Sequence, residues 1–374
     1  MTTAPDPLII EMGRKFSAER LAPGAAAREK AAAIEPEIIA ELGELGILGA
    51  TTPVEWDGSD IDPVTYALLL EEIAAGDGSV STLVSVHNSP TCAVLAMYGT
   101  DAQKERWLRP LATGRHLGSF GLTEPQAGSD ASNLRTRAAK KGDRYVINGS
   151  KQFISSGSLP GSIVLFAVTD PDAGKRGLSC FVVDKAAPGY KVLRKESKLG
   201  QKASDTCALA FEDMEVGEDQ RVGAEGQGYR IALSTLESGR IGIAAQSIGM
   251  ARAALETAIA YARDRTAFGE AIINHQAVAF RLVDAKTRLE AARQLMLHAA
   301  RLKAEGENAL EAACMAKLFA SEAAEAICTA AIQTLGGYGY LSDYPVERIY
   351  RDVRVCQIYE GTSDVQKIIL QRML

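Results

Sequence analysis

Hydrophobic positions along this 374-residue chain change their spacing twice. In the first and last thirds they recur at the period of a helix, whereas residues 116–216 carry short apolar runs bounded by Gly, Pro or Asp. These changes predict an α+β multidomain chain. We expect an N-terminal helical domain over residues 1–115, a middle antiparallel β domain over 116–222 and a C-terminal four-helix bundle over 223–374.

The N-terminal third predicts helices over residues 36–48, 64–75 and 104–111. Asp62 and Pro63 supply an N-cap and a first-turn proline for the second helix, and Thr100 with Gln103 forms a capping box ahead of the third. Gly76 and Gly114 follow the ends of these two helices. In the middle third, strands are expected at 145–147, 151–155, 162–168 and 178–183, with an Asn148-Gly149 hairpin turn between the first two.

The C-terminal third predicts four helices. The first carries a single apolar stripe, formed by Ile241, Ile248, Leu255, Ile259 and Ala262. The others are expected at 276–303, 309–335 and 364–374, and abundant alanine allows them to approach closely.

Composition excludes several classes of protein. The chain has 41 Lys+Arg against 47 Asp+Glu, a net charge of −6, which argues against nucleic-acid binding. No apolar run reaches the roughly 18 to 20 residues of a membrane span, and residues 1–10 lack the features of a secretory signal. We therefore expect a cytoplasmic protein whose six scattered cysteines are reduced core residues.

Common catalytic motifs are missing. The four histidines form no H-x-x-x-H or H-E-x-x-H pattern, and no cysteine cluster accompanies them, so no metal site is expected. The sequence also lacks G-x-S-x-G, G-x-G-x-x-G after a strand, and a P-loop. A bound cofactor would therefore need a binding site of a less common kind.

Four polar, glycine-bearing segments stand out, at residues 122–130, 265–269, 333–340 and 358–363. Each alone reads most simply as a turn or a helix cap. Their occurrence together in one chain favours a functional interpretation.

At these segments the sequence resembles the acyl-CoA dehydrogenase family, over nearly the whole chain. The motifs that carry the resemblance are LTEPQAGSD at 122–130, KQFISSG at 151–157, RTAFG at 265–269, QTLGGYGY at 333–340 and YEGTSDVQ at 359–366. The resemblance implies noncovalent FAD, removal of hydrogens from Cα and Cβ of an acyl-CoA thioester, and transfer of the β-hydrogen as hydride to flavin N5. It also implies electron-transfer flavoprotein as electron acceptor and a homotetramer built as a dimer of dimers.

The resemblance also implies roles for individual residues. In the middle domain, Leu122, Thr123, Phe153 and Ser155 would lie against the flavin, although many relatives have Trp and Thr in place of Phe153 and Ser155. The ADP part of a neighbouring subunit's FAD would be held by Arg265, Phe268, Gln276, Gln333, Gly336 and Gly337. Thr362 and Ser363 would bond the pyrophosphate of the FAD in their own subunit. The acyl-CoA would contact Ser129, Glu237, Arg240 and Gly361, and Ser129 is counted with the cofactor residues as well.

Glu360 is the expected catalytic base. In this family the enolate is stabilised by a ribityl hydroxyl and by the backbone N–H of the catalytic Glu, and a desolvated carboxylate has a raised pKa that suits it to proton abstraction. Taken alone, Glu360 reads more simply as an exposed acid before a helix, favoured there by the helix dipole, and it is the other four motifs that favour catalysis. In some relatives the base comes from the position that Gly239 matches. Glu124, Glu237 and Asp364 are read as structural or hydrogen-bonding acids, and Cys356 as packing.

Three alternatives within the fold remain open. An acyl-CoA oxidase would use O₂, but its usual C-terminal helical extension is missing here. A monooxygenase-like or nitroalkane-oxidising relative fits the YEGTS context less well, and a noncatalytic scaffold would not need the base. The YEGTS and TLESGRIGIA segments most resemble short-chain and short branched-chain members, while acyl length, pathway and final electron acceptor stay open.

Overall fold

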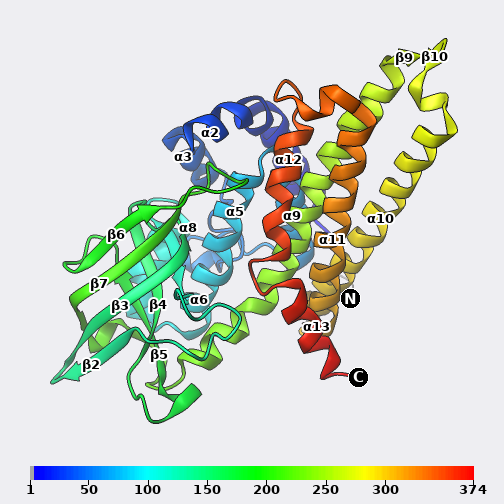
Figure 1. The fold of residues 1–374 in the computed structure, drawn as a ribbon. Coiled ribbons are helices and arrows are strands. Elements are labelled where there is room, and N and C mark those ends of the chain that lie inside the picture. Colours follow the sequence, from blue (N-terminus) through cyan, green and yellow to red (C-terminus); the bar gives the residue numbers. More distant parts are fainter. Residues whose placement is uncertain (1–3) are drawn as a thin grey trace.

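The computed structural model describes residues 4–374. Helices at the two ends of the chain pack together on one side of the molecule, and a twisted sheet lies on the other (Figure 1). The predicted fold class is confirmed, whereas the limits at residues 115 and 222 stay a prediction. No helix in the described part of the chain is long and apolar enough to cross a membrane.

The N-terminal part is helical, and its capping signals act as the sequence predicts. The Asp62 side chain accepts from the N–H groups of Val64 and Thr65, and the capping box of Thr100 and Gln103 is present. The helix predicted over 36–48 ends at Glu44, because Gly46 adopts a left-handed conformation with φ +69° and reverses the chain. The α-helices are α1 (Pro7–Phe16), α2 (Ala25–Ala31), α3 (Pro36–Glu44), α4 (Pro63–Gly76), α5 (Gly78–Val86), α6 (Ala93–Tyr98), α7 (Asp101–Gln103) and α8 (Arg109–Ala112).

The middle part forms one eight-stranded sheet in the order β6-β7-β3-β2-β4-β5-β8, with β1 paired to β4. Most neighbouring strands are antiparallel, but β4 pairs in parallel with β1 and with β2. The strands are β1 (Leu117–Gly121), β2 (Arg137–Lys141), β3 (Arg144–Ser155), β4 (Gly161–Val168), β5 (Leu178–Asp184), β6 (Tyr190–Lys195), β7 (Thr206–Gly217) and β8 (Arg221–Val222).

The predicted turn at Asn148-Gly149 was wrong. Strand β3 passes straight through these residues, and its pairing with β7 shifts register there by a bulge. Asn148 Nδ2 donates to Asp213 Oδ1 at 3.0 Å, and its Oδ1 accepts from the Asp213 N–H at 2.9 Å, so the amide stabilises the bulge. Gly149 is required because a Cβ there would lie 2.6 Å from Thr136 Cα.

The C-terminal part contains three long helices, α9 (Gly228–Asp264), α10 (Gln276–Ala304) and α11 (Leu310–Leu335). A small hairpin, β9 (Thr266–Ala267) and β10 (Glu270–Ala271), lies between α9 and α10 at one tip of the molecule (Figure 1). The fourth helical position is divided between α12 (Val346–Val353) and α13 (Ser363–Gln371), both packed on α11. The sequence did not predict α12, which is only eight residues long.

The helical ends share a core. Helix α4 packs against α9, and a cluster of buried side chains joins α4, α9, α10 and α11. Four of the five predicted stripe residues, Ile241, Ile248, Leu255 and Ala262, are almost fully buried, while Ile259 is half-buried. All six cysteines are buried and free, as predicted.

Candidate functional site

Glu360 lies in the break between α12 and α13. It has φ +54°, and the next residue, Gly361, has φ +85°. A left-handed conformation costs a non-glycine residue about 1–2 kcal/mol, so the surrounding structure has to hold it. Thr362 then caps α13 by accepting from the Val365 N–H at 3.2 Å. The segment therefore presents Glu360 from a constrained turn.

The carboxylate of Glu360 is desolvated. Its Oε2 is buried and has no hydrogen-bond partner among the described residues. Burial raises the pKa of Glu360 to about 7, and the positive charges of Arg240 and Lys317 oppose that rise. A carboxylate with a pKa near neutrality and a free oxygen is suited to taking up a proton.

Gly239 of α9 faces this carboxylate. A Cβ at position 239 would come within 2.6 Å of Glu360 Oε2 and 2.9 Å of its Cδ. The position that the resemblance implies as an alternative source of the base thus meets Glu360 at one place in the fold.

A second group of predicted residues lies on the sheet. Phe153 on β3 has φ +60° and a side chain that is 64% exposed, an unusual environment for a phenylalanine in a strand. Thr123 and Ser155 are half-buried, and the Thr123 carbonyl accepts from the Gln152 N–H at 2.9 Å. Phe153 and Ser155 lie on β3, and Thr123 is bonded to the same strand through Gln152, so we call these three residues the platform.

A buried ion pair holds that platform. Lys151 Nζ lies 2.8 Å from Glu124 Oε1 and donates to the Leu122 carbonyl at 3.0 Å. Glu124 also accepts from the N–H groups of Arg135 and Thr136. The Lys151 ammonium and these donors hold the pKa of Glu124 below its usual range. Glu124 therefore has the structural role that the sequence predicts.

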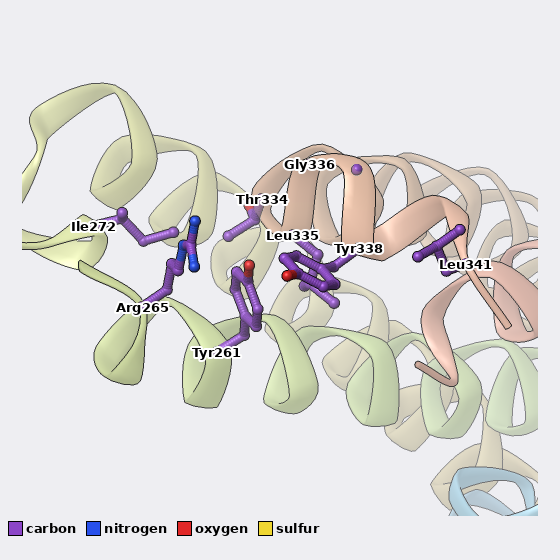
Figure 2. Close-up of a pocket in the computed structure, with 9 residues that line it drawn as sticks. Tyr261, Arg265, Ile272, Thr334, Leu335, Gly336, Tyr338 and Leu341 are labelled. Atoms are coloured by element: carbon purple, nitrogen blue, oxygen red, sulfur yellow. The ribbon is translucent and has the colours of Figure 1, made fainter. Parts of the chain in front are cut away.

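A third group lies at the tip of the bundle, around a pocket of about 500 Å³ (Figure 2). Arg265 extends from the end of α9 toward Thr334 at the end of α11, beside the rings of Tyr261 and Tyr338. The predicted residues Arg265, Gly336 and Gly337 all line this pocket. Phe268, Gln276 and Gln333 lie close to these residues in the sequence and are exposed, Phe268 to 97%.

The structure separates this pocket from Glu360. Gly239 and Arg265 lie on and at the end of the same helix, 26 residues apart, which corresponds to about 39 Å at 1.5 Å per residue. The structure therefore brings Gly361, Thr362, Ser363 and Arg240 close to Glu360 but leaves the Arg265 group at the far end of α9.

The remaining predicted contacts differ in their surroundings. Ser129 is exposed on the loop before β2. It follows Gly128, where an added Cβ would have no other atom within 4 Å. Glu237 pairs with Lys303 at 2.9 Å, in agreement with a structural acid. Arg240 is 6% exposed, and its Nε has no partner in the described chain.

Sequence reasoning missed several polar residues around the Glu360 turn. Lys317, on α11, is fully buried, and its Nζ donates to the Gly361 carbonyl at 2.6 Å. Tyr359 donates to Gln246 Oε1 at 3.1 Å, and Gln246 in turn donates to Ser81 at 2.8 Å. The available signal was a lysine and a glutamine among the small and apolar residues of α11 and α9.

Comparison with known proteins identifies the class. Family models for the N-terminal, middle and C-terminal domains of acyl-CoA dehydrogenases match residues 6–115, 119–214 and 226–374. An acyl-CoA dehydrogenase of Bacillus subtilis is 44% identical over 367 residues, covering 98% of this chain and 97% of the relative. A short-chain specific acyl-CoA dehydrogenase of Clostridium acetobutylicum is 40% identical, covering 97% and 96%.

Two further relatives bear on structure and assembly. The structure of butyryl-CoA dehydrogenase from Megasphaera elsdenii matches with a TM-score of 0.97 at 39% identity, covering 100% of this chain and 99% of that one. The CarC subunit of the caffeyl-CoA reductase-Etf complex of Acetobacterium woodii is 41% identical, covering 92% and 91%.

The chain belongs to the acyl-CoA dehydrogenase family, whose members use FAD. It is an acyl-CoA dehydrogenase, an oxidoreductase.

Proposed function

We propose that the protein removes the α- and β-hydrogens of a short-chain or short branched-chain acyl-CoA, with Glu360 as the base for the α-proton. The observation that carries this proposal is the buried, unpartnered Oε2 of Glu360, on a carboxyl group whose pKa is raised to about 7. The similarity to short-chain specific and butyryl-CoA dehydrogenases supports the substrate class.

Individual residues of the chain would have the following roles in the reaction. The left-handed turn at Glu360 and Gly361 aims the carboxylate at Cα of the bound thioester. The α-proton is a weak acid, so a donor must stabilise the charge that develops on the thioester oxygen. We assign the backbone N–H of Glu360 to that role, and the proton moves to the Glu360 carboxylate.

The residues present fit an FAD molecule. When bound, FAD would supply the hydride acceptor for the β-hydrogen. The platform of Thr123, Phe153 and Ser155 would hold the flavin, and Thr362 and Ser363 would bond the pyrophosphate. Ser363 supports this assignment because its Oγ is buried without a partner in the described structure. Arg265 and the glycines of the tip pocket would hold the ADP part of an FAD bound in a neighbouring subunit of a homotetramer.

Electron-transfer flavoprotein is the proposed electron acceptor. The relative in Acetobacterium woodii is a subunit of a complex with Etf, which supports this partner over direct reaction with O₂. Mixing the acyl-CoA-reduced enzyme with a bacterial electron-transfer flavoprotein should reoxidise it much faster than dissolved oxygen does.

The test of the proposed function is the anaerobic addition of butyryl-CoA to the yellow holoenzyme. Wild type should bleach, whereas Glu360→Gln should keep FAD and bind butyryl-CoA but lose bleaching, because its amide cannot take the α-proton. Rapid recovery of colour in air would point to an oxidase instead. Colour without bleaching for wild type would point to a scaffold or another substrate, and a near-normal rate for Glu360→Gln would refute the base assignment.

A further inference from the structure

Lys317 lies where a lysine is rarely found. It is fully buried in α11, on a helix face otherwise formed by residues such as Ala313, Ala316 and Ala320. A buried ammonium is unfavourable unless it has close partners. The described partner of its Nζ is the carbonyl of Gly361, at 2.6 Å.

A second buried side chain acts on the same turn. Gln366 of α13 is fully buried, and its Nε2 donates to the Glu360 carbonyl at 3.2 Å and to the Gly361 carbonyl at 2.9 Å. Two side chains from two helices thus hold the carbonyls of both left-handed residues. Without these bonds, the left-handed conformation of Glu360 would be less stable.

Lys317 also acts through its charge. Its cation lowers the pKa of Glu360 against the effect of burial, and the Glu360 carboxylate raises the pKa of Lys317 against the same effect. The other groups that act on the pair are Arg240 from α9, Cys356 from the segment before the turn, and Cys314 from α11. Arg240 and Lys317 are the two cations that lower the pKa of Glu360, and Arg240 has the larger effect.

We propose that Lys317 is a positioning residue for the dehydrogenation: it fixes the turn that aims Glu360, and its charge favours the ionised form of that carboxylate. The hydrogen bond to Gly361 supplies the first effect, and because it holds the ammonium beside the turn that carries the carboxylate, it also supplies the second. Gln366 supplies only the first, since an amide carries no net charge. The inference rests on the proposed role of Glu360 as the base.

The test measures the titration of the Glu360 carboxyl directly. Infrared spectra of the holoenzyme are recorded over a range of pH, and the band that disappears in Glu360→Gln is followed. In Lys317→Met this titration should move to higher pH by about one unit, toward the lower end of the effect of a close opposite charge. The rate of anaerobic flavin reduction by butyryl-CoA should fall about 10- to 100-fold, because the carboxylate is no longer held in the orientation that proton transfer requires.

Three further variants separate the two effects. Gln366→Met should slow flavin reduction without moving the titration. Lys317→Gln keeps a hydrogen-bond donor but loses the charge, so it should move the Glu360 titration. It also replaces Lys317→Met in this test if that variant does not fold. Ser321→Ala, one turn further along α11 and bonded only to the Leu318 carbonyl through its Oγ, should change neither property. FAD content and circular dichroism check each fold.

The inference is overturned if both Lys317 variants titrate as wild type does, or if Lys317→Met reduces its flavin within about twofold of the wild-type rate. Failure of the proposed function looks different, because no acyl-CoA would then reduce the wild-type flavin. The infrared titration does not depend on turnover, so it still decides whether Lys317 controls the carboxylate.

Discussion

A methyl group on Gly239 would lie 2.6 Å from Oε2 of Glu360, closer than real side-chain carbons approach an oxygen. The bare backbone of α9 at this point therefore leaves the room that the Glu360 carboxylate occupies. It also means that a carboxylate placed at position 239 would enter the same space.

We predict that a base at position 239 replaces the base at 360. Glu360→Gly should reduce turnover by about 10²- to 10⁴-fold, the usual contribution of a positioned base. Adding Gly239→Glu should raise turnover at least tenfold above that of Glu360→Gly, which corresponds to about 1.4 kcal/mol, and should change the preferred acyl length. The matched control, Gly239→Gln with Glu360→Gly, has the same size but no base and should stay inactive. A double variant with normal FAD content but no gain over Glu360→Gly would contradict the prediction.

Gly239→Glu alone should be impaired. Two carboxylates in one desolvated space raise each other's pKa and crowd the substrate. Steady-state turnover of this single variant across pH checks the point, and full activity would show that the new side chain points elsewhere.

The raised pKa of Glu360 also predicts a pH-dependent effect on stability. The folded pKa is about 7 and the ordinary value is 4.5, so the folded state binds more protons between these values. Ionised Glu360 therefore destabilises the fold above pH 7, by up to about 3 kcal/mol, and this effect disappears below pH 4.5. Glu360→Gln should raise Tm at pH 8 and gain progressively less as the pH falls.

Calorimetry of the holoenzyme at several pH values measures this difference. The exposed Glu307, for which the structure gives no ion pair, provides the control, and Glu307→Gln should show no comparable trend. A gain for Glu360→Gln that is the same at pH 5 and pH 8 would argue against a buried, desolvated carboxylate.

Arg265→Ala should weaken the retention of FAD by about tenfold or more, because a charge-assisted hydrogen bond to a phosphate is worth about 1.5–3 kcal/mol. Arg263→Ala, two residues away and also exposed, should leave retention unchanged. FAD occupancy after gel filtration and sedimentation of the same samples measure both properties. A monomer with full occupancy would refute a site shared between subunits.

The acyl chain should be short. We expect the highest kcat/KM with straight or methyl-branched acyl groups of about four to six carbons, since one buried CH₂ gains only about 0.8 kcal/mol and a clash with a closed pocket outweighs it. A panel of acyl-CoAs from about four to sixteen carbons checks this. A maximum at about twelve carbons or beyond would overturn the chain-length proposal but leave the dehydrogenase class intact.

Periodicity and capping residues predicted the elements that local chemistry specifies. Asp62 and Thr100 cap their helices as expected, because such caps depend only on the next few residues. Asn148-Gly149 failed as a turn because its partners are distant in the sequence: Asp213 lies on β7, and Thr136 directly precedes β2. A two-residue signal cannot show whether a glycine is needed for a turn or for close strand packing.

The candidate site shows the same division. Glu360 could be proposed as the base because its motif is contiguous, whereas Lys317 is 43 residues away and meets Gly361 only through the packing of α11 against α13. The facing of Gly239 and Glu360 was expected only through the resemblance to relatives, since no spacing rule links a helix glycine to a loop 121 residues later.

The length of α9 has a consequence for dilute solutions. The helix places Glu360 near one end and the Arg265 pocket at the other, so in the proposed homotetramer a separated subunit would keep its proposed base but lose the cofactor contacts of its neighbour. Dilution should therefore inactivate the enzyme by release of flavin, at protein concentrations where the chain is still folded. Added FAD should restore activity by mass action, and the concentration it requires reports the strength of the subunit contact rather than the stability of the fold.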